Sequence, residues 1–472
     1  LEYFQADTIR RYREIIGDET LLLSGADENA LKNVQAAEKE GVPIQEFLDR
    51  NSEVFRNTYK RLGIKLDVFQ RGSDQKNHWP GVKKLWNLCE KHGDIYKKQY
   101  SGLYCVGCES FKTEKELVEG FCPEHHTKPE KITEENYFFR LSKYQNKLLQ
   151  LIESEEFKIK PTNKRAEIVS FIKGGLEDFS ISRSRERAKN WGVPVPDDPT
   201  QIQYVWFDAL ANYITAAGYS SDEARFAMWW QENPNIVHVI GKGVSRFHAL
   251  YWPGMLLSAG VRVPKEIFIH GYFTINGEKM SKSLGNVIDP SDLVEQYGAD
   301  PVRYFLLRGI SSYDDGDFSE ARFKEVYNAD LANGLGNFVQ RVTTLAQKAN
   351  LTDITKASGK FEPLVAQVKE DVKTALEEYR FDHAIEAVWR LVAAGDGYVN
   401  ETKVWEKAGE EQLAVLADLA SLILSIANLL DIFLPATAAE IAKRFGLTIA
   451  LLRTPKAHPL AIAKGEPLFR RL

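Results

Sequence analysis

The residues of this chain that could do chemistry begin with a lysine pair in the loop 274–286, "TINGEKMSKSLGN". Lys279 and Lys282 lie three apart, between the turn dipeptides "NG" and "GN". We therefore expect a mobile loop whose two ammonium groups can close over a polyphosphate. The alternative is that both lysines are simply solvated, which is the commoner fate of a loop lysine.

A second candidate site lies in the segment "YCVGCESFKTEKELVEGFCPEHH", which carries two tight pairs of metal-ligand residue types. Cys105 and Cys108 form a C-x2-C pair, and Cys122 and His125 form a C-x2-H pair. Two such pairs joined by a short arm suit a tetrahedral zinc ion, and four protein ligands make that zinc structural. The alternatives are a chance pairing or a redox C-x-x-C. His126 could replace His125.

Short strands and helices that could position such residues alternate in the first part of the chain. Apolar runs at 21–23 and in "IQYVWFDA", "NIVHVIGKG" and "EIFIHGYFTI" predict strands, with helices at "DALANYITAAG" and "FHALYWPGMLLSAG" between the later ones. The pattern predicts an α/β fold with a doubly wound parallel, Rossmann-type sheet. Ligands bind such sheets beyond the carboxyl ends of the strands, where Asp27, Trp206, Asp208 and His270 fall.

Other segments predict three further features of the architecture. Residues 1–16 have helical apolar spacing and Gly17 is a stop signal, so we expect a chain that opens on a helix and lacks its first strand. Strand signals are interrupted between about 97 and 165, which predicts an insertion carrying the zinc knuckle. After about residue 318, long amphipathic stretches with Gly or Pro punctuation predict an all-α helical bundle.

The composition excludes several classes of protein. The 472 residues suggest two to four domains, and 44% hydrophobic with 27% charged residues is typical of a soluble globular protein. We find no apolar run of the roughly 20 residues that a membrane span needs, so we expect a cytoplasmic protein without a membrane partner. A net charge of −5 limits nucleic-acid contacts to local patches. Four cysteines do not make a disulfide scaffold, and Cys89 is expected to be a buried thiol.

Several long motifs in order are similar to the methionyl-tRNA synthetase family of class I aminoacyl-tRNA synthetases. They are "HGYFTINGEKMSKS", "YVWFDALANY", "YCVGC...FCPEH", "DFSISRSRERAKNWGVPVP" and "GADPVRYFLLR". The resemblance covers essentially the whole chain. It implies an enzyme that joins methionine to the α-phosphate of ATP with Mg²⁺, releases pyrophosphate and passes methionyl to the 3′ end of tRNA(Met).

The resemblance also implies roles for individual residues. Lys282 matches the family's main phosphate-contacting lysine, Lys279 matches the first lysine of the signature, and Arg183 matches an arginine near the substrates. Asp27 matches the group that holds the methionine ammonium. The pocket wall would be formed by Trp206, Ala209, Tyr213 and His270. For each aromatic residue taken alone, the alternative is ordinary core packing. For Arg183, the alternative is a surface position.

The bundle resembles the family's anticodon-binding domain. Asn337 and Arg341 lie four apart on one helical face, and Trp405 matches the family's stacking tryptophan. A helix cap, a solvated arginine and a core tryptophan are the corresponding alternatives.

The implied domains are the first half of the catalytic domain at 1–97, the insertion at 98–165, the second half at 166–273, the KMSKS loop and stem-contact region at 274–317, and the bundle at 318–472. We expect a monomer, because the chain ends soon after the bundle.

Two departures from the family pattern leave alternatives open. The HIGH signature should lie immediately before "LEYFQADT", and we do not find it. In "SGADENA", Asn29 stands where the family usually has histidine. The alternatives are a class I synthetase for cysteine or an aliphatic amino acid, although the insertion is short for an editing domain. A third alternative is a non-catalytic tRNA-binding relative.

Overall fold

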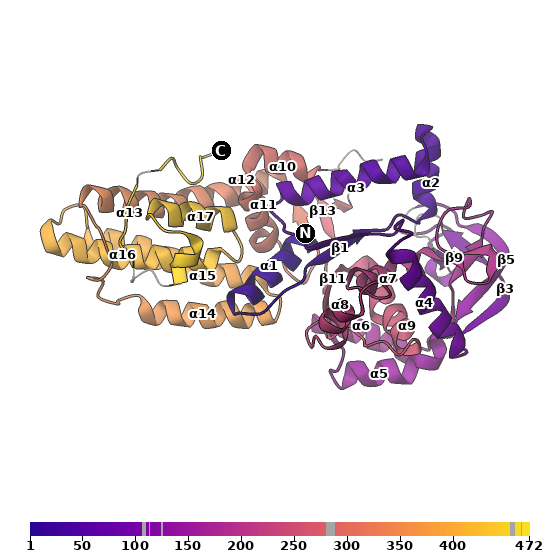
Figure 1. The fold of residues 1–472 in the computed structure, drawn as a ribbon. Coiled ribbons are helices and arrows are strands. Elements are labelled where there is room, and N and C mark those ends of the chain that lie inside the picture. The colour runs from indigo at the N-terminus through magenta and orange to yellow at the C-terminus, as the bar shows by residue number, and fades with distance from the viewer. Residues whose placement is uncertain (106–109, 113, 124–125, 280–287, 454–457, 464) are drawn as a thin grey trace. The chain divides into compact units, whose positions relative to one another are not determined.

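The computed structural model describes residues 1–472 except 106–109, 113, 124–125, 280–287, 454–457 and 464 (Figure 1). The chain divides into two compact units. The α/β unit is formed by residues 21–60 and 65–269, and the helical unit by residues 1–20, 61–64 and 270–472. The expected N-terminal helix is α1 (Glu2–Ile15), and it belongs to the helical unit.

The first parallel sheet of the α/β unit pairs β1 (Leu23–Ala26) with β2 (Val68–Arg71). A Cβ on Gly25 of β1 would approach the Gln70 carbonyl oxygen of β2 to 2.5 Å. Glycine therefore allows the two strands to lie this close.

A second sheet in this unit has the strand order β11–β12–β6. Its strands are β11 (Val237–Gly241), β12 (Glu266–His270) and β6 (Lys158–Lys160), and β12 pairs in parallel with β6. The predicted α/β class is confirmed, with the parallel strand pairs of this unit divided between two small sheets.

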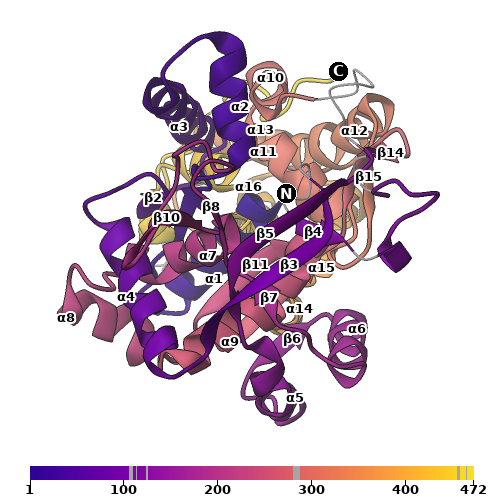
Figure 2. The ribbon, with the colours of Figure 1, turned by 90° about the vertical axis from the view of Figure 1, so that its right-hand side faces the viewer.

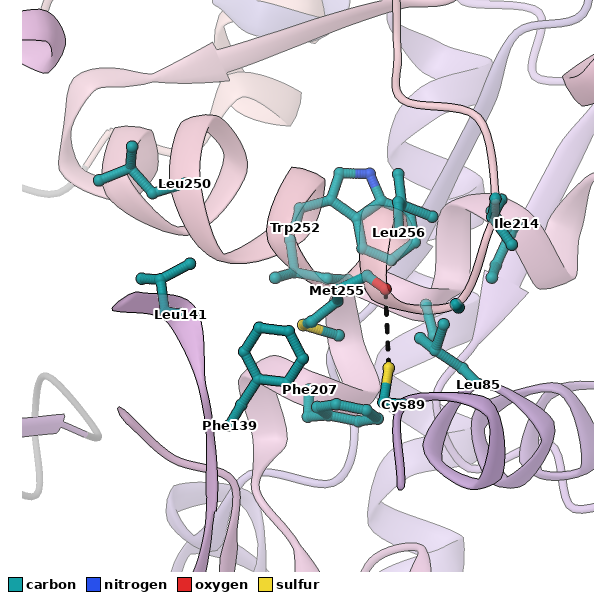
Figure 3. Close-up of a cluster of buried hydrophobic side chains, with 14 of the residues drawn as sticks. Leu85, Cys89, Phe139, Leu141, Phe207, Ile214, Leu250, Trp252, Met255 and Leu256 are labelled. Carbon is teal, nitrogen blue, oxygen red and sulfur yellow. Dashed lines mark hydrogen bonds between the residues drawn. The ribbon is translucent and has the colours of Figure 1, made fainter. Parts of the chain in front are cut away.

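Apolar helices form the core of the α/β unit. In this core, α4 (His78–Lys91), α7 (Val205–Ala216) and α9 (Trp252–Ser258) bring together side chains that include Leu85, Phe207 and Met255 (Figure 3). The rings of Trp86 and Phe207 meet edge to face at 5.4 Å. Cys89 is fully buried, as predicted, and burial raises the pKa of its thiol to about 12. The thiol is therefore a packing group.

The segment in which strand signals are interrupted contains the longest strand ladder among the described residues. In it, β3 (Ile95–Cys105) pairs antiparallel with β5 (Glu130–Phe139) along ten residue pairs (Figure 2). β4 (Ser110–Lys112) and β7 (Phe179–Ser180) complete a four-stranded sheet. The sequence prediction missed this ladder because the middle of both strands is largely solvated and offers no apolar run.

Smaller elements complete the α/β unit. A three-stranded antiparallel sheet has the order β8 (Ser182–Ser184), β10 (Asp198–Gln203), β9 (Pro194–Val195). The remaining elements are α2 (Leu31–Glu40), α3 (Ile44–Arg61), η1 (Glu114–Glu116), η2 (Leu141–Tyr144), α5 (Gln145–Glu153), α6 (Thr162–Lys173), α8 (Glu223–Phe226), η3 (Ala227–Gln231), η4 (Lys242–Val244) and η5 (Phe247–Tyr251).

The helical unit confirms the predicted all-α region. Its bundle helices include α13, α15, α16 and α17 (Figure 1). A small sheet, β14–β13–β15, precedes them. The elements after β12 are β13 (Phe273–Ile275), β14 (Glu278–Lys279), α10 (Pro290–Tyr297), α11 (Ala299–Tyr304), η6 (Phe305–Gly309), β15 (Gly316–Phe318), α12 (Glu320–Val326), η7 (Tyr327–Gly336), α13 (Asn337–Lys348), α14 (Glu362–Glu377), α15 (Phe381–Thr402), α16 (Gly409–Leu430), α17 (Pro435–Arg444) and η8 (Ile449–Arg453).

Helix α1 is tied into the helical unit by a buried ion pair. The Arg303 guanidinium lies 2.8 Å from the Asp7 carboxylate, and both side chains are fully buried. Arg303 also donates to the Phe433 carbonyl oxygen at 2.7 Å. Removal of Asp7 would leave Arg303 buried without its ion-pair partner, which costs about 3–5 kcal/mol. Asp7 has a second partner, because Arg11 donates to its carboxylate at 2.7 Å.

Helix α16 corrects the expectation that no apolar run is long enough to span a membrane. Its 22 residues are long and apolar enough by composition alone. However, 72% of its most apolar window is buried inside the protein. A helix that is apolar on all sides and covered by other helices is a core helix, and this is the role of α16 in the bundle.

Candidate active site

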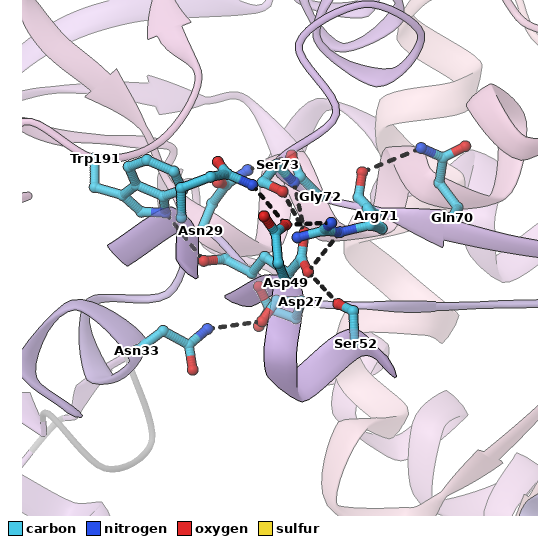
Figure 4. Close-up of polar contacts among 12 residues, drawn as sticks. Asp27, Asn29, Asn33, Asp49, Ser52, Gln70, Arg71, Gly72, Ser73 and Trp191 are labelled. Atoms are coloured by element: carbon cyan, nitrogen blue, oxygen red, sulfur yellow. Dashed lines mark hydrogen bonds and ion pairs between the residues drawn. The ribbon is translucent and has the colours of Figure 1, made fainter. Parts of the chain in front are cut away.

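The turn that follows β1 buries two of its three polar side chains and exposes the third. Glu28 is 2% exposed, and its carboxylate accepts hydrogen bonds from Ser52, Ser73 and Arg71, at 2.9 Å from Arg71 Nε (Figure 4). The Asp27 side chain is exposed. Glu28 therefore stabilises the turn, and Asp27 lies exposed at the carboxyl end of β1, as predicted.

Asn29, the departure from the family pattern, is buried and connects the turn to α7. Its side-chain nitrogen donates to the Gly72 carbonyl oxygen at 2.7 Å and to the Asp208 carboxylate at 2.5 Å. The other Asp208 oxygen lies 2.6 Å from His78 Nε2, which is therefore a donor. His78 Nδ1 lies 2.8 Å from the Thr215 hydroxyl. The sequence prediction placed Asp208 at a strand end where ligands bind, whereas the structure places it on α7, 2% exposed, within this network.

Helix α7 also carries the predicted pocket residues. Trp206 is half-buried and stacks on Phe247, with the ring centroids 3.8 Å apart. The Tyr213 hydroxyl lies 2.7 Å from Nε2 of His248, and Ala209 is half-buried on the same helix. The structure therefore brings Trp206 and Tyr213 together with two residues that the sequence prediction missed.

Phe247 and His248 could have been found from the run "RFHALYW" after β11, where an aromatic and an imidazole follow the carboxyl end of a strand. Next to them, His238 is 5% exposed, and its ring lies 4.2 Å from that of Tyr213. Burial lowers the pKa of His238 well below its ordinary 6.5, and the nearby His248 lowers it further. His238 is therefore neutral at physiological pH.

The predicted wall residue His270 belongs to the helical unit, whereas the other predicted wall residues belong to the α/β unit. It is 8% exposed, and its Nδ1 lies 2.7 Å from the Gly271 carbonyl oxygen. Its Nε2 lies 3.2 Å from the Glu2 carboxylate. His270 therefore has protein partners on both ring nitrogens.

Arg183 is not the surface arginine that was the alternative reading. It lies on β8 and is 7% exposed. Its guanidinium lies over the rings of Tyr204 at 4.2 Å and Tyr104 at 5.1 Å. It donates to the Ser182 carbonyl oxygen at 2.7 Å. A buried cation between two aromatic faces is held rigidly, which suits a group that must present positive charge in a fixed place.

The KMSKS segment is described only at its start. Strands β13 and β14 form a hairpin whose turn residues Asn276 and Gly277 both have positive φ, as the Asn-Gly dipeptide predicts. The Asp317 carboxylate accepts hydrogen bonds from Thr274 and from the Gly277 amide, both at 2.7 Å. Lys279 ends β14, and Lys282 lies outside the described residues.

The structure describes two of the four predicted zinc ligands. Cys105 and Cys122 are both buried, at 1% and 0% exposure. Thr127 contacts both cysteines, because its carbonyl oxygen accepts from the Cys122 amide at 2.9 Å and its hydroxyl lies 4.0 Å from the Cys105 sulfur. Cys108 and His125 lie outside the described residues, and within the described part of the chain no group of three or more metal-ligand side chains is assembled.

The predicted anticodon residues lie on α13 and just after α15. Asn337 begins α13 and is exposed. Arg341 donates to Asp396 and Asn400, each at 3.0 Å, and its guanidinium lies 5.8 Å from the ring centroid of Trp405. Trp405 is 46% exposed, so it is not the core tryptophan of the alternative reading. The structure therefore brings Arg341 and Trp405 together.

A polar cavity of about 460 Å³ opens at the carboxyl end of β2, a position that sequence reasoning did not single out. Side chains of both charges line it. The lining residues are Gln45, Arg56, Phe69, Gln70, Arg71, Ser73, Asp74, Gln75 and Lys76.

The family described as tRNA synthetases class I (M) matches residues 1–131 and 125–343 of this chain. The chain belongs to this family. Two bacterial class I relatives named methionine–tRNA ligase extend the match. The protein of Thermotoga maritima is 37% identical over 491 residues, covering 99% of this chain and 76% of its own. That of Caldanaerobacter subterraneus is 39% identical over 485 residues, covering 99% and 75%.

Solved structures of class I synthetases agree with the sequence comparison. The crystal structure of Mycobacterium tuberculosis methionyl-tRNA synthetase bound by methionyl-adenylate has a TM-score of 0.92 and 35% sequence identity, covering 99% of this chain and 96% of that one. The apo form of the same enzyme gives a TM-score of 0.85 at 31% identity. The fold predicted by resemblance is therefore that of the family.

Proposed function

We propose that this chain is a methionine–tRNA ligase that uses ATP to activate methionine and then charges tRNA(Met). The observation that carries the proposal is the near full-length likeness to a structure holding methionyl-adenylate, at 35% identity and a TM-score of 0.92. The relatives named methionine–tRNA ligase support it, because they cover 99% of this chain.

In the first step, a methionine carboxylate oxygen attacks the α-phosphorus of ATP, and the bond to the pyrophosphate oxygen breaks. Negative charge builds up on the α-phosphate and the leaving pyrophosphate, so positioned cations lower the barrier. We assign this role to Lys279 and Lys282 from the family match, with Arg183 as a third, rigidly held cation. Mg²⁺ bound to the phosphate oxygens would neutralise further charge when ATP is present.

Methionine selection is assigned to the turn after β1 and to α7. Asp27 would pair with the ammonium group, whose burial requires an opposite charge. Trp206, Ala209 and Tyr213 would contact the thioether, for which aromatic neighbours are favourable. The Trp206 indole N–H is buried and has no hydrogen-bond partner in the described part of the chain, which suits a ligand acceptor.

Two histidines are also assigned to methionine binding. His248 would act as a wall residue through its contact with Tyr213. His270 is assigned from the family match alone.

In the second step, a hydroxyl of the terminal ribose of tRNA attacks the methionyl carbonyl carbon, and AMP leaves. The bundle at 318–472 would read the anticodon. An exposed tryptophan beside an arginine can stack on an unpaired base, while Asn337 supplies edge hydrogen bonds.

A structural zinc ion held by Cys105, Cys108, Cys122 and His125 is part of the proposal. The fit rests on Cys105 and Cys122, two buried cysteines that Thr127 contacts. Thiolates and an imidazole are the ligand types that zinc prefers. When bound, zinc would cross-link the tip of the insertion. We further assign the catalytic halves to 1–97 and 166–273, the insertion to 98–165 and the stem-contact region to 274–317, in a monomeric, cytoplasmic enzyme.

The two chemical steps can be tested separately on the purified enzyme. Methionine-dependent ATP–pyrophosphate exchange reports activation, and transfer of labelled methionine to tRNA(Met) reports the complete reaction. Lys282→Ala should lower kcat of exchange at least tenfold and leave the methionine dissociation constant within about twofold, because the lysine acts mainly in the transition state. A parent protein that binds tRNA but shows neither activity would instead be a non-catalytic relative.

A further inference from the structure

The two halves of the proposed methionine site are joined by a buried hydrogen-bond chain. The Asp27 turn carries Asn29, and the pocket helix α7 carries Asp208, with 2.5 Å between the Asn29 nitrogen and the Asp208 oxygen. These two side chains are 9% and 2% exposed. Hydrogen bonds to a buried charged group are stronger and costlier to lose than those in water, so this contact constrains both elements.

The orientation of Asn29 is fixed by its partners. The Gly72 carbonyl oxygen and the Asp208 carboxylate are both acceptors, so the amide must point its nitrogen at them. Its amide oxygen then faces a third direction, where it is buried without a hydrogen-bond partner in the described ranges. Asn29 therefore connects the turn to Asp208 through its amide nitrogen.

His78 holds Asp208 from the other side and returns to the same helix. Its two ring nitrogens reach Asp208 at 2.6 Å and Thr215 at 2.8 Å. These helix positions are seven residues apart, or about two turns, and so lie on one face. A fully buried imidazole that contacts both Asp208 and Thr215 resists rotation of α7 about its axis.

The face of α7 that carries Asp208 and Thr215 lies opposite the pocket face, which carries Trp206 and Tyr213. At about 100° per residue, Trp206 and Tyr213 point one way and Asp208 and Thr215 point roughly 140–180° away from them. Ala209 shares the Trp206 face. Rotation of the helix that relaxed the network would therefore turn the pocket side chains by the same angle.

We propose that Asn29, Asp208 and His78 are positioning residues for methionine, which lock the Asp27 turn to α7 and fix the direction in which the pocket face points. This inference rests on the proposed function. It assigns no contact with methionine to the three residues, which act through Asp27, Trp206 and Tyr213. It also gives Asn29 a specific role, as a neutral donor to a buried carboxylate.

The test compares four variants in methionine-dependent ATP–pyrophosphate exchange. Asn29→Leu removes the donors at similar volume and should raise the methionine KM about tenfold, with the ATP KM within about twofold and kcat within about threefold. Thr215→Val, a milder change, should raise the methionine KM about threefold. Asn29→His keeps an N–H that can reach Asp208 and should stay within about threefold of the parent. Ser258→Ala is the matched control.

Ser258 donates to the buried carboxylate of Asp94 at 2.8 Å and contacts neither Asn29 nor Asp208 by a hydrogen bond that the structure records. Its loss should lower the thermal midpoint without changing the methionine KM. The inference is overturned if Asn29→Leu leaves the methionine KM unchanged, or raises both KM values equally. If Asn29→Leu does not fold, an unchanged methionine KM in Thr215→Val overturns it. A parent without methionine-dependent exchange would refute the proposed function first, before any variant is compared.

Discussion

Truncation of Trp405 should separate tRNA recognition from methionine activation. The indole is 46% exposed, and the Arg341 guanidinium lies 5.8 Å from its ring centroid. A cation–π contact at an exposed site is worth about 0.5–1 kcal/mol, and the covered half of the ring adds about 1 kcal/mol from burial. We therefore expect Trp405→Ala to lower the free energy of unfolding by about 2 kcal/mol.

The effect on tRNA charging should be larger. Stacking of one base on an aromatic side chain contributes about 1–3 kcal/mol, which corresponds to a roughly 5- to 150-fold loss in kcat/KM for tRNA. Exchange of pyrophosphate into ATP with methionine needs no tRNA, so its kcat and methionine KM should stay within about twofold of the parent values.

Trp389 provides the control for this experiment. It lies on α15 in the same bundle, half-buried, with its ring 4.6 Å from that of Tyr304. Trp389→Ala should cost about 3–5 kcal/mol of stability through the cavity it leaves. It should lower the thermal midpoint far more than Trp405→Ala. The assignment of Trp405 is refuted if its truncation lowers exchange as much as charging, or leaves charging unchanged.

Three further changes test other parts of the account. Tyr213→Phe removes a 2.7 Å hydrogen bond to His248, worth about 0.5–1.5 kcal/mol, and should raise the methionine KM roughly 3- to 10-fold in exchange assays; an unchanged KM would remove this bond from the pocket. Metal analysis should find about one zinc per chain and much less in Cys105→Ser; equal zinc in both would exclude Cys105 as a ligand. The pKa of Asp198 is about 2, because hydrogen bonds, chiefly from Thr200 and Lys97, outweigh the burial that would raise it. The ionised Asp198 carboxylate therefore stabilises the folded protein fully above the ordinary pKa of 3.8, and this stabilisation is lost as the pH falls towards 2. The free energies of unfolding of the parent and of Asp198→Asn, measured in urea, should therefore differ at pH 6 and converge near pH 2. A difference that does not change with pH would contradict that assignment.

Local patterns in the sequence predicted the elements whose residues contact near neighbours. The helical spacing of residues 1–16 corresponds to α1, and the Asn276-Gly277 dipeptide corresponds to the turn between β13 and β14. The strand predicted at "IQYVWFDA" was wrong, because β10 ends at Gln203, pairs antiparallel with β8 and β9, and is followed by α7 from Val205, which includes Trp206 and Asp208. Apolar periodicity and positive φ are properties of short segments, so they can be read without knowing the fold.

Contacts between distant segments could not be read in this way. Asn29 and Asp208 are 179 positions apart, and the stack of Trp206 on Phe247 joins two elements through tertiary packing. The antiparallel ladder of β3 and β5 was missed because its solvated middle has the polar composition of a loop. The family resemblance predicted roles for Asp27 and Trp206, but it did not include the buried side chains that contact the elements on which they lie.

ATP–pyrophosphate exchange by the purified enzyme across the twenty standard amino acids is the decisive test of methionine activation. We predict exchange with methionine and at least about a hundredfold lower kcat/KM with cysteine, valine, leucine and isoleucine. Exchange driven mainly by one of those four would contradict the assignment of the Trp206 and Tyr213 pocket to a thioether. Exchange with none of the twenty would contradict the proposed enzyme activity itself.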